Sequence, residues 1–101
     1  MKTVMVRYKT SEAGADPNAE SIRAVFDELR ALAPKDFRYA SYRMPDGVSF
    51  VHIATHAAPP AENPLTSLPA FKAFQAKLKE RCVEPPVVTE LSPVDAYEAR
   101  A

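Results

Sequence analysis

The chain of 101 residues contains no tryptophan, one cysteine and only two glycines. A single cysteine, Cys82, cannot form an internal disulfide, so a reducing compartment such as the cytoplasm is expected. With glycine only at Gly14 and Gly47, the chain has no glycine-rich loop of the kind that cradles phosphate groups. A Gly-x-Ser-x-Gly motif, which carries the nucleophile of α/β-hydrolases, is also missing.

Neither an excess of charge nor a long apolar run is present. The 13 lysines and arginines balance 13 acidic residues, which argues against nucleic acid and anionic membrane surfaces as partners. No apolar run approaches the ~20 residues that span a bilayer. The segment Met1–Arg7 is too short and too soon charged for a secretory signal. We therefore expect a cytoplasmic protein with no nucleic-acid or membrane partner.

What is present is typical of one globular domain. The hydrophobic fraction of 47% and the charged fraction of 26% are ordinary for a folded protein. A chain of this length buries roughly two-thirds of the surface exposed by its unfolded form, enough for a core without metal or disulfide. We expect a single domain over residues 1–101, with a short tail from about residue 92.

The N-terminal third predicts a strand and a helix. Residues 3–9 alternate between apolar and other side chains, which indicates a β-strand. Asp16 followed by Pro17 is a typical helix start. Apolar residues spaced by three and four then predict an amphipathic helix over 17–33, ended by Pro34.

The central region predicts a β-hairpin. Residues 37–44 and 48–55 are rich in aromatic and β-branched residues, and Asp46-Gly47 lies between them. A two-residue turn there pairs Arg43 with Phe50, Tyr42 with Val51, Ser41 with His52, and Ala40 with Ile53.

The C-terminal third predicts a loop, a helix and a strand. Three prolines make 56–66 a loop. Ser67 is expected to cap a helix over 68–82, which Pro85-Pro86 prevents from continuing. Residues 87–91 form the last strand. The fold class is therefore α+β: a ferredoxin-like β-α-β-β-α-β domain with a four-stranded antiparallel sheet, strand order 4-1-3-2, and two helices on one face.

Both faces of the predicted sheet are apolar or aromatic, although helices can cover only one. One face carries Ala40, Tyr42, Met44, Val51 and Ile53, and the other carries Phe37, Tyr39, Arg43, Val48, Phe50, His52 and Ala54. A second copy packed on the remaining face is the simplest way to cover it. We expect a homodimer that forms through a sheet face, and the sequence does not decide which of the two faces is the dimer seam.

From Lys2 to about Leu91 the chain resembles the dimeric α/β-barrel superfamily, in particular the antibiotic-biosynthesis-monooxygenase-like domains. The resemblance lies in element order, length, the two-faced sheet, and runs such as Phe50–Ala54 and Pro69–Phe74. It implies a pocket between sheet and helices and, in some members, cofactor-independent oxygenation of aromatic compounds. The chain lacks the tryptophan that several haem-degrading and polyketide-oxidising members use in the pocket, and residues 68–82 contain no histidine for haem iron.

His52 is the candidate catalytic residue because it lies in the middle of an apolar, central strand. A neutral imidazole there could draw a proton from a phenol or enol. The alternative is a structural histidine that is hydrogen-bonded across the sheet or dimer seam. His56 begins the predicted loop and is expected to be exposed to solvent.

Five further residues are candidates for substrate binding. Aromatic side chains can orient an aromatic ligand, and an arginine can hold an oxyanion or carboxylate. The alternative for each is ordinary packing or a cross-strand ion pair. The candidates are Tyr8, Tyr39, Tyr42, Arg43 and Phe71.

No cofactor or metal is expected. His52 and His56 are four residues apart, and no nearby cysteine completes a ligand set. Cys82 has no motif partner and is expected to pack as an ordinary helix-end thiol.

Three functions fit the sequence to different degrees. The first is a cofactor-independent monooxygenase-like enzyme that acts on a small aromatic or quinol. The second is a non-catalytic binding or accessory domain of the same fold. An RNA-binding sheet shares the element order, but the neutral charge and the missing aromatic RNA-binding motif count against it.

Overall fold

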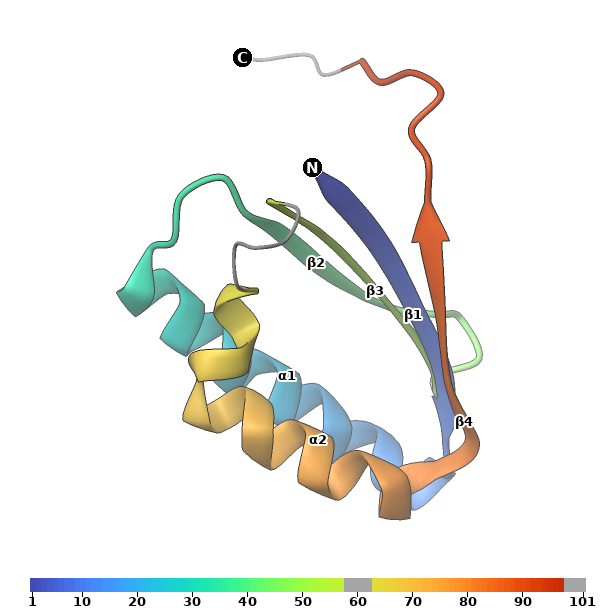
Figure 1. Ribbon diagram of the computed structural model, residues 1–101. Coiled ribbons are helices and arrows are strands. Elements are labelled where there is room, and N and C mark those ends of the chain that lie inside the picture. The colour runs from blue at the N-terminus through green and yellow to red at the C-terminus, as the bar shows by residue number, and fades with distance from the viewer. Residues whose placement is uncertain (58–62, 98–101) are drawn as a thin grey trace.

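The computed structural model describes residues 1–57 and 63–97 and shows the predicted order of elements (Figure 1). Both helices lie on the same side of a four-stranded sheet, and the C-terminal tail leaves the sheet after its last strand. The elements are β1 (Lys2–Thr10), α1 (Glu12–Leu32), β2 (Arg38–Arg43), β3 (Ser49–His56), the 3-10 helix η1 (Pro64–Ser67), α2 (Pro69–Arg81) and β4 (Cys82–Leu91).

The sheet is antiparallel with the strand order β2-β3-β1-β4, which confirms the predicted topology. Strands β1 and β3 are central, and β2 and β4 form the edges. None of the helices in the described part of the chain is long and apolar enough to cross a membrane. The fold class is therefore the predicted ferredoxin-like α+β domain.

The hairpin register is the predicted one, whereas its turn is longer. Ser41 pairs with His52 and Arg43 with Phe50, as expected. The chain turns over Met44–Gly47, and Gly47 has a φ of 79°, a left-handed conformation that favours glycine. The carboxylate of Asp46 accepts hydrogen bonds from the hydroxyl and amide of Ser49, and its pKa is lowered to about 2 mainly by that hydroxyl. The observed loop of four residues gives the same strand pairing as the predicted turn of two residues. The predicted register is therefore confirmed, although the predicted turn length was wrong.

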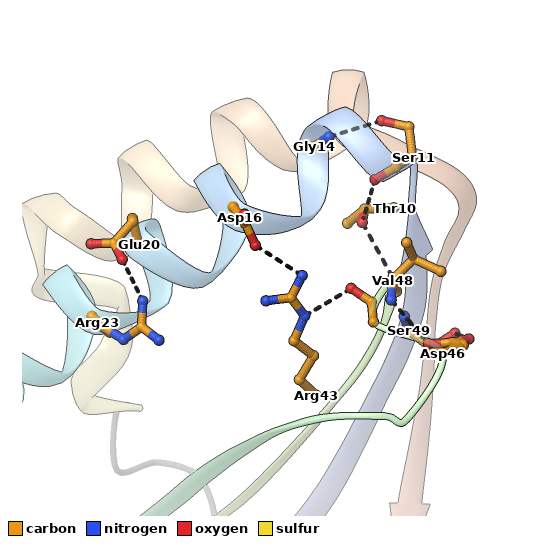
Figure 2. A network of polar contacts seen from close by, with 11 residues as sticks. Thr10, Ser11, Gly14, Asp16, Glu20, Arg23, Arg43, Asp46, Val48 and Ser49 are labelled. Atoms are coloured by element: carbon orange, nitrogen blue, oxygen red, sulfur yellow. Dashed lines mark hydrogen bonds and ion pairs between the residues drawn. The ribbon is translucent and has the colours of Figure 1, made fainter.

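Helix α1 begins earlier than predicted, and this part of the prediction was wrong. Ser11 is the N-cap, and its hydroxyl accepts a hydrogen bond from the amide of Gly14 (Figure 2). Pro17 lies inside the helix rather than at its start. Asp16 faces outward and pairs with Arg43 instead of capping the helix. The sequence prediction chose Asp16 as the helix start because a proline follows it, whereas Ser11, five residues earlier, supplies the same capping chemistry.

Two expectations for the C-terminal third were also wrong. The hydroxyl of Ser67 donates to the carbonyl of Pro64, so α2 starts at Pro69 without a side-chain cap. Strand β4 begins at Cys82 and runs through Pro85-Pro86. An edge strand tolerates prolines because one of its sides needs no amide donors. Part of the predicted loop, residues 58–62, lies outside the described residues.

The core lies between the sheet and the two helices. Tyr8 and Phe50 come from the central strands, Val25 from α1, and Phe74 and Leu78 from α2, and all five are buried. The rings of Tyr8 and Phe50 stack with their centroids 5.6 Å apart. Aromatic side chains of the sheet therefore meet the helices on one face only, and this face also carries the polar groups described below.

Within residues 1–57 and 63–97, no helix lies over the opposite face of the sheet (Figure 1). In its centre Val51 pairs with Arg7 and Tyr42, and Ile53 pairs with Met5 and Ala40. Tyr42 is 57% exposed, and Val87 at the same face of β4 is 62% exposed.

Candidate functional site: a buried histidine beside an apolar cavity

His52 lies on the helix side of central strand β3 and is 4% exposed. Its ring lies between two tyrosine rings from the neighbouring strands. The centroid of His52 is 5.3 Å from that of Tyr8 and 5.9 Å from that of Tyr39, with both pairs stacked. Phe74 of α2 approaches it from the helix layer with a centroid distance of 5.6 Å. Packing from both layers fixes the plane of the imidazole.

The Nε2 side of His52 is bonded to a chain of two polar residues. The hydroxyl of Tyr8 lies 2.7 Å from Nε2, and the side-chain amide of Asn18 donates to the same hydroxyl at 2.8 Å. Since Asn18 supplies the donor, the proton of Tyr8 is left to point at Nε2. In this arrangement Nε2 is the acceptor, and Nδ1 carries the proton of the neutral ring.

The Nδ1 side of His52 meets two hydroxyl groups. Ser41 Oγ lies at 2.6 Å and the Tyr39 hydroxyl at 2.9 Å. A single N–H group forms one strong hydrogen bond, and the nearer serine can take it. Because Tyr39 can then turn its proton elsewhere, it is the member of this cluster best able to donate to a ligand.

Burial keeps all three groups uncharged at neutral pH. Desolvation lowers the pKa of His52 from 6.5 to about 4. Desolvation likewise raises the pKa of Tyr39 to about 12, and it raises the pKa of Tyr8 further above its ordinary value. The site therefore offers a neutral imidazole and two protonated phenols, not a fixed charge.

A cavity of about 270 Å³ opens beside this cluster, between the sheet and the segment containing η1 and α2. Its volume is close to the lower end of small-molecule sites, so a ligand of one or two rings would suit it. Most of its wall is apolar. The lining residues are Val4, Val6, Tyr8, Tyr39, His52, Ala54, His56, Asn63, Leu65, Phe71, Phe74, Gln75, Leu78, Pro86 and Val88.

The structure brings together some of the predicted site residues and not others. Tyr8, Tyr39 and Phe71 line the cavity with His52. Tyr42 lies on the uncovered face of the sheet, since neighbouring residues of a strand point to opposite faces. Arg43 lies on the helix side but at the sheet edge, where its guanidinium reaches Asp16, as Figure 2 shows. Neither Tyr42 nor Arg43 contributes to the wall of the cavity.

His56 is placed differently from the sequence expectation. It is the last residue of β3, is half-buried and lines the cavity, so its expected position in an exposed loop was wrong. Asn63 lines the same cavity, and its side-chain oxygen accepts the amide proton of Leu65 at the start of η1. The cavity wall therefore carries polar side chains besides the cluster around His52, among them His56 and Asn63.

Among residues 1–57 and 63–97, no group of three or more histidine, cysteine or acidic side chains is arranged to hold a metal ion. Cys82 is half-buried where α2 meets β4, and burial raises the pKa of its thiol. It does not line the cavity beside His52.

Sequence reasoning missed two residues that position the site. Asn18 is fully buried, and it precedes Ile22 and Val25 on the apolar face of α1. A polar residue in that helical register is a signal for a buried hydrogen bond. Ser41 was correctly paired with His52 but not recognised as its hydrogen-bond partner.

The sequence matches no protein-family model, and no curated protein is similar to it at a significant level. Solved structures do share its fold. Rv0793 from Mycobacterium tuberculosis is 21% identical with a TM-score of 0.76, covering 96% of this chain and 98% of that one. A structure described as an antibiotic biosynthesis monooxygenase is 14% identical with a TM-score of 0.77, covering 94% and 100%.

A third similar structure is SnoaB from Streptomyces nogalater, described as a cofactor-independent oxygenase. It is 17% identical with a TM-score of 0.61, and 94% of each chain is covered. At these identities the likeness concerns the fold. The chain therefore has the fold of the antibiotic-biosynthesis-monooxygenase-like proteins, as its sequence predicted.

Proposed function

We propose that the protein is a cofactor-independent monooxygenase-like enzyme that acts on a small aromatic or quinol-type compound. The observation that carries this proposal is the buried imidazole of His52, hydrogen-bonded to Tyr8 and Ser41 with the Tyr39 hydroxyl beside it, at one wall of an otherwise largely apolar cavity. Such a wall suits an aromatic ring, and the few polar groups can orient its oxygen atoms. Similar structures described as monooxygenases support the same reaction class.

In this reaction a ring carbon activated by a phenol or enol loses a proton, and His52 is the base. Because the hydroxyl of Tyr8 occupies Nε2, the proton reaches His52 through Tyr8, which passes its own proton to Nε2 as it accepts the new one. Tyr39 donates to the oxygen on which negative charge develops. The carbanion transfers electrons to dioxygen and forms a carbon–oxygen bond. Loss of water then leaves a ketone, with one oxygen atom in the product and the other in water.

Dioxygen uptake tests this function. The purified protein, with a metal chelator and no added flavin, should consume dioxygen with members of a panel of quinols and phenolic ketones. His52→Ala should abolish turnover while the protein stays folded by circular dichroism. Thr55→Val, which changes the other face of the same strand, should keep turnover. Turnover retained in His52→Ala would remove His52 as the base.

A second function, binding without catalysis, is favoured by one observation. Both ring nitrogens of His52 are hydrogen-bonded to protein hydroxyls, and its lowered pKa makes it a weak base. Ligand binding with no dioxygen uptake across the panel would support this second function.

The protein is further proposed to be a homodimer, with the uncovered face of the sheet as the seam. Its centre is formed by side chains that no helix covers, among them Val51, Ile53 and Tyr42. Burying several hundred Å² per partner contributes on the order of ten kcal/mol at about 25 cal/mol per Å², before the costs of association.

A further inference from the structure

The cavity has a second polar end, at His56, which the reaction described above does not use. His56 and His52 lie on the same strand four residues apart, so both face the helix side, roughly 13 Å apart along β3. The ring nitrogens of His52 are occupied by hydroxyl groups of the protein. The polar contacts of His56 differ in a way that matters for a ligand.

The hydrogen bond of His56 fixes its tautomer. Its Nδ1 lies 2.8 Å from the carbonyl oxygen of Ala57. A carbonyl oxygen can only accept, so Nδ1 must carry a proton. In the neutral ring Nε2 is therefore unprotonated and has a free lone pair. Within residues 1–57 and 63–97, this Nε2 has no hydrogen-bond partner.

We propose that Nε2 of His56 is a ligand-binding acceptor that receives a hydroxyl proton of the bound compound at the outer end of the cavity. The inference rests on the proposed function in so far as the same cavity holds the ligand. It narrows the ligand class to aromatic diols whose two oxygens lie at opposite ends of the ring system. One hydroxyl meets the Tyr39 hydroxyl, and the other donates to His56.

Two matched compounds test the second hydroxyl. Naphthalene-1,5-diol and 5-methoxy-1-naphthol have the same ring system and share one hydroxyl, and in the second compound a methyl group replaces the proton that the second oxygen would donate. Titrations under argon prevent turnover during the measurement. The intact protein should bind the diol about fivefold to twentyfold more tightly, the range that one additional hydrogen bond provides together with the symmetry of the diol.

Variants in strand β3 test whether His56 causes the tighter binding of the diol. His56→Leu should lose most of the preference for the diol while still binding both compounds. Thr55→Val, whose hydroxyl bonds to Thr3 on the opposite face of the sheet, should keep it. A preference that persists in His56→Leu, or equal binding of the two compounds to the intact protein, overturns the role of His56 but leaves the cavity as a ligand site. If neither compound binds, the aromatic ligand class of the proposed function fails as well.

A spectroscopic readout does not depend on any variant folding. The chain has only two histidines, so a protein labelled with ¹⁵N in its imidazole rings gives two sets of ring signals. In the neutral form of its ring, His56 of the free protein should show Nδ1 protonated and Nε2 bare. Addition of the diol should move the Nε2 signal of His56. A free protein with the proton on Nε2, or a diol that moves only the signals of His52, would refute the assignment.

Discussion

The two faces of the sheet use the same strand for different purposes. Along β3, Phe50 and His52 point toward the helices and are buried, whereas Val51 and Ile53 point away and are partly exposed. The covered face contains hydrogen-bonded hydroxyl and imidazole groups together with an open cavity. The centre of the uncovered face carries Met5, Ala40, Val51 and Ile53, with Arg7 beside them.

This difference between the two faces shows where the fold can form an enclosed polar site. Polar groups gain strength from exclusion of water only if each has a partner, and the helix layer supplies partners such as Asn18. The open face has no second layer of its own, so it can contribute contact area but no enclosed polar site. Function is therefore expected under the helices, and self-association on the other side.

The largest expected effect is loss of the dimer on placing a charge in the open face. Ile53→Arg puts a second guanidinium beside Arg7, which lies diagonally across on β1, so the new charge meets a like charge rather than a partner. Association should weaken at least about a hundredfold, since an unpaired buried charge costs several kcal/mol. Light scattering with size-exclusion chromatography should show a dimer for the intact protein and a monomer for the variant. Ala24→Arg, on the exposed side of α1, should remain dimeric. An intact protein that is monomeric at micromolar concentration would contradict the open face as a seam.

A smaller effect, on the covered face, is a pH dependence of stability caused by His52. Its pKa is about 4 when folded and 6.5 in the unfolded chain, so the unfolded state binds the proton more readily. The stability is fully present above pH 6.5 and is lost as the pH falls toward 4, by up to about 3 kcal/mol. Urea unfolding at fixed protein concentration measures it. His52→Gln should flatten this part of the profile, and parallel profiles for the two proteins would show that His52 is not the cause.

The fold was predictable because its signals are redundant. Alternation in β1, the Asp46-Gly47 turn and the apolar spacing of α1 each point to the same topology, so a wrong helix start or turn length changed nothing else. The predicted start of the last strand, placed after Pro85-Pro86, was wrong for a physical reason. Pro85-Pro86 ends a helix in any context, but an edge strand accepts it, and only the strand order shows that β4 is an edge.

The site was predictable only in part. The buried position of His52 follows from alternation, as does the side of the sheet on which Tyr39 lies. The hydroxyls of Tyr8 and Tyr39 converge on His52 because they occupy diagonal positions on neighbouring strands, which requires the register of β1 against β3. A local pattern contains no such information. The same limit explains why His56, at a strand end, was expected in solvent.

The smallest expected effect tests whether the edge of the covered face belongs to the site. Arg43 donates to Asp16 at 3.0 Å (Figure 2) and to the carbonyl of Gly47 at 2.7 Å. Its guanidinium lies 5.6 Å from the centroid of the Phe50 ring. The ion pair is largely exposed, with side chains 39% and 88% accessible, so Arg43→Met should cost less than about 1 kcal/mol.

Binding of naphthalene-1,5-diol should be unchanged in Arg43→Met, because Arg43 does not line the cavity and two of its nitrogens already donate within the protein. Asp16→Asn, which removes only the carboxylate charge, is the matched control and should have a still smaller effect on the urea midpoint. A loss of diol affinity of about tenfold in Arg43→Met, absent in Asp16→Asn, would mean that the guanidinium reaches the ligand after all. The covered face would then act as a site out to its edge, and the sequence-based assignment of Arg43 to substrate binding would be the correct one.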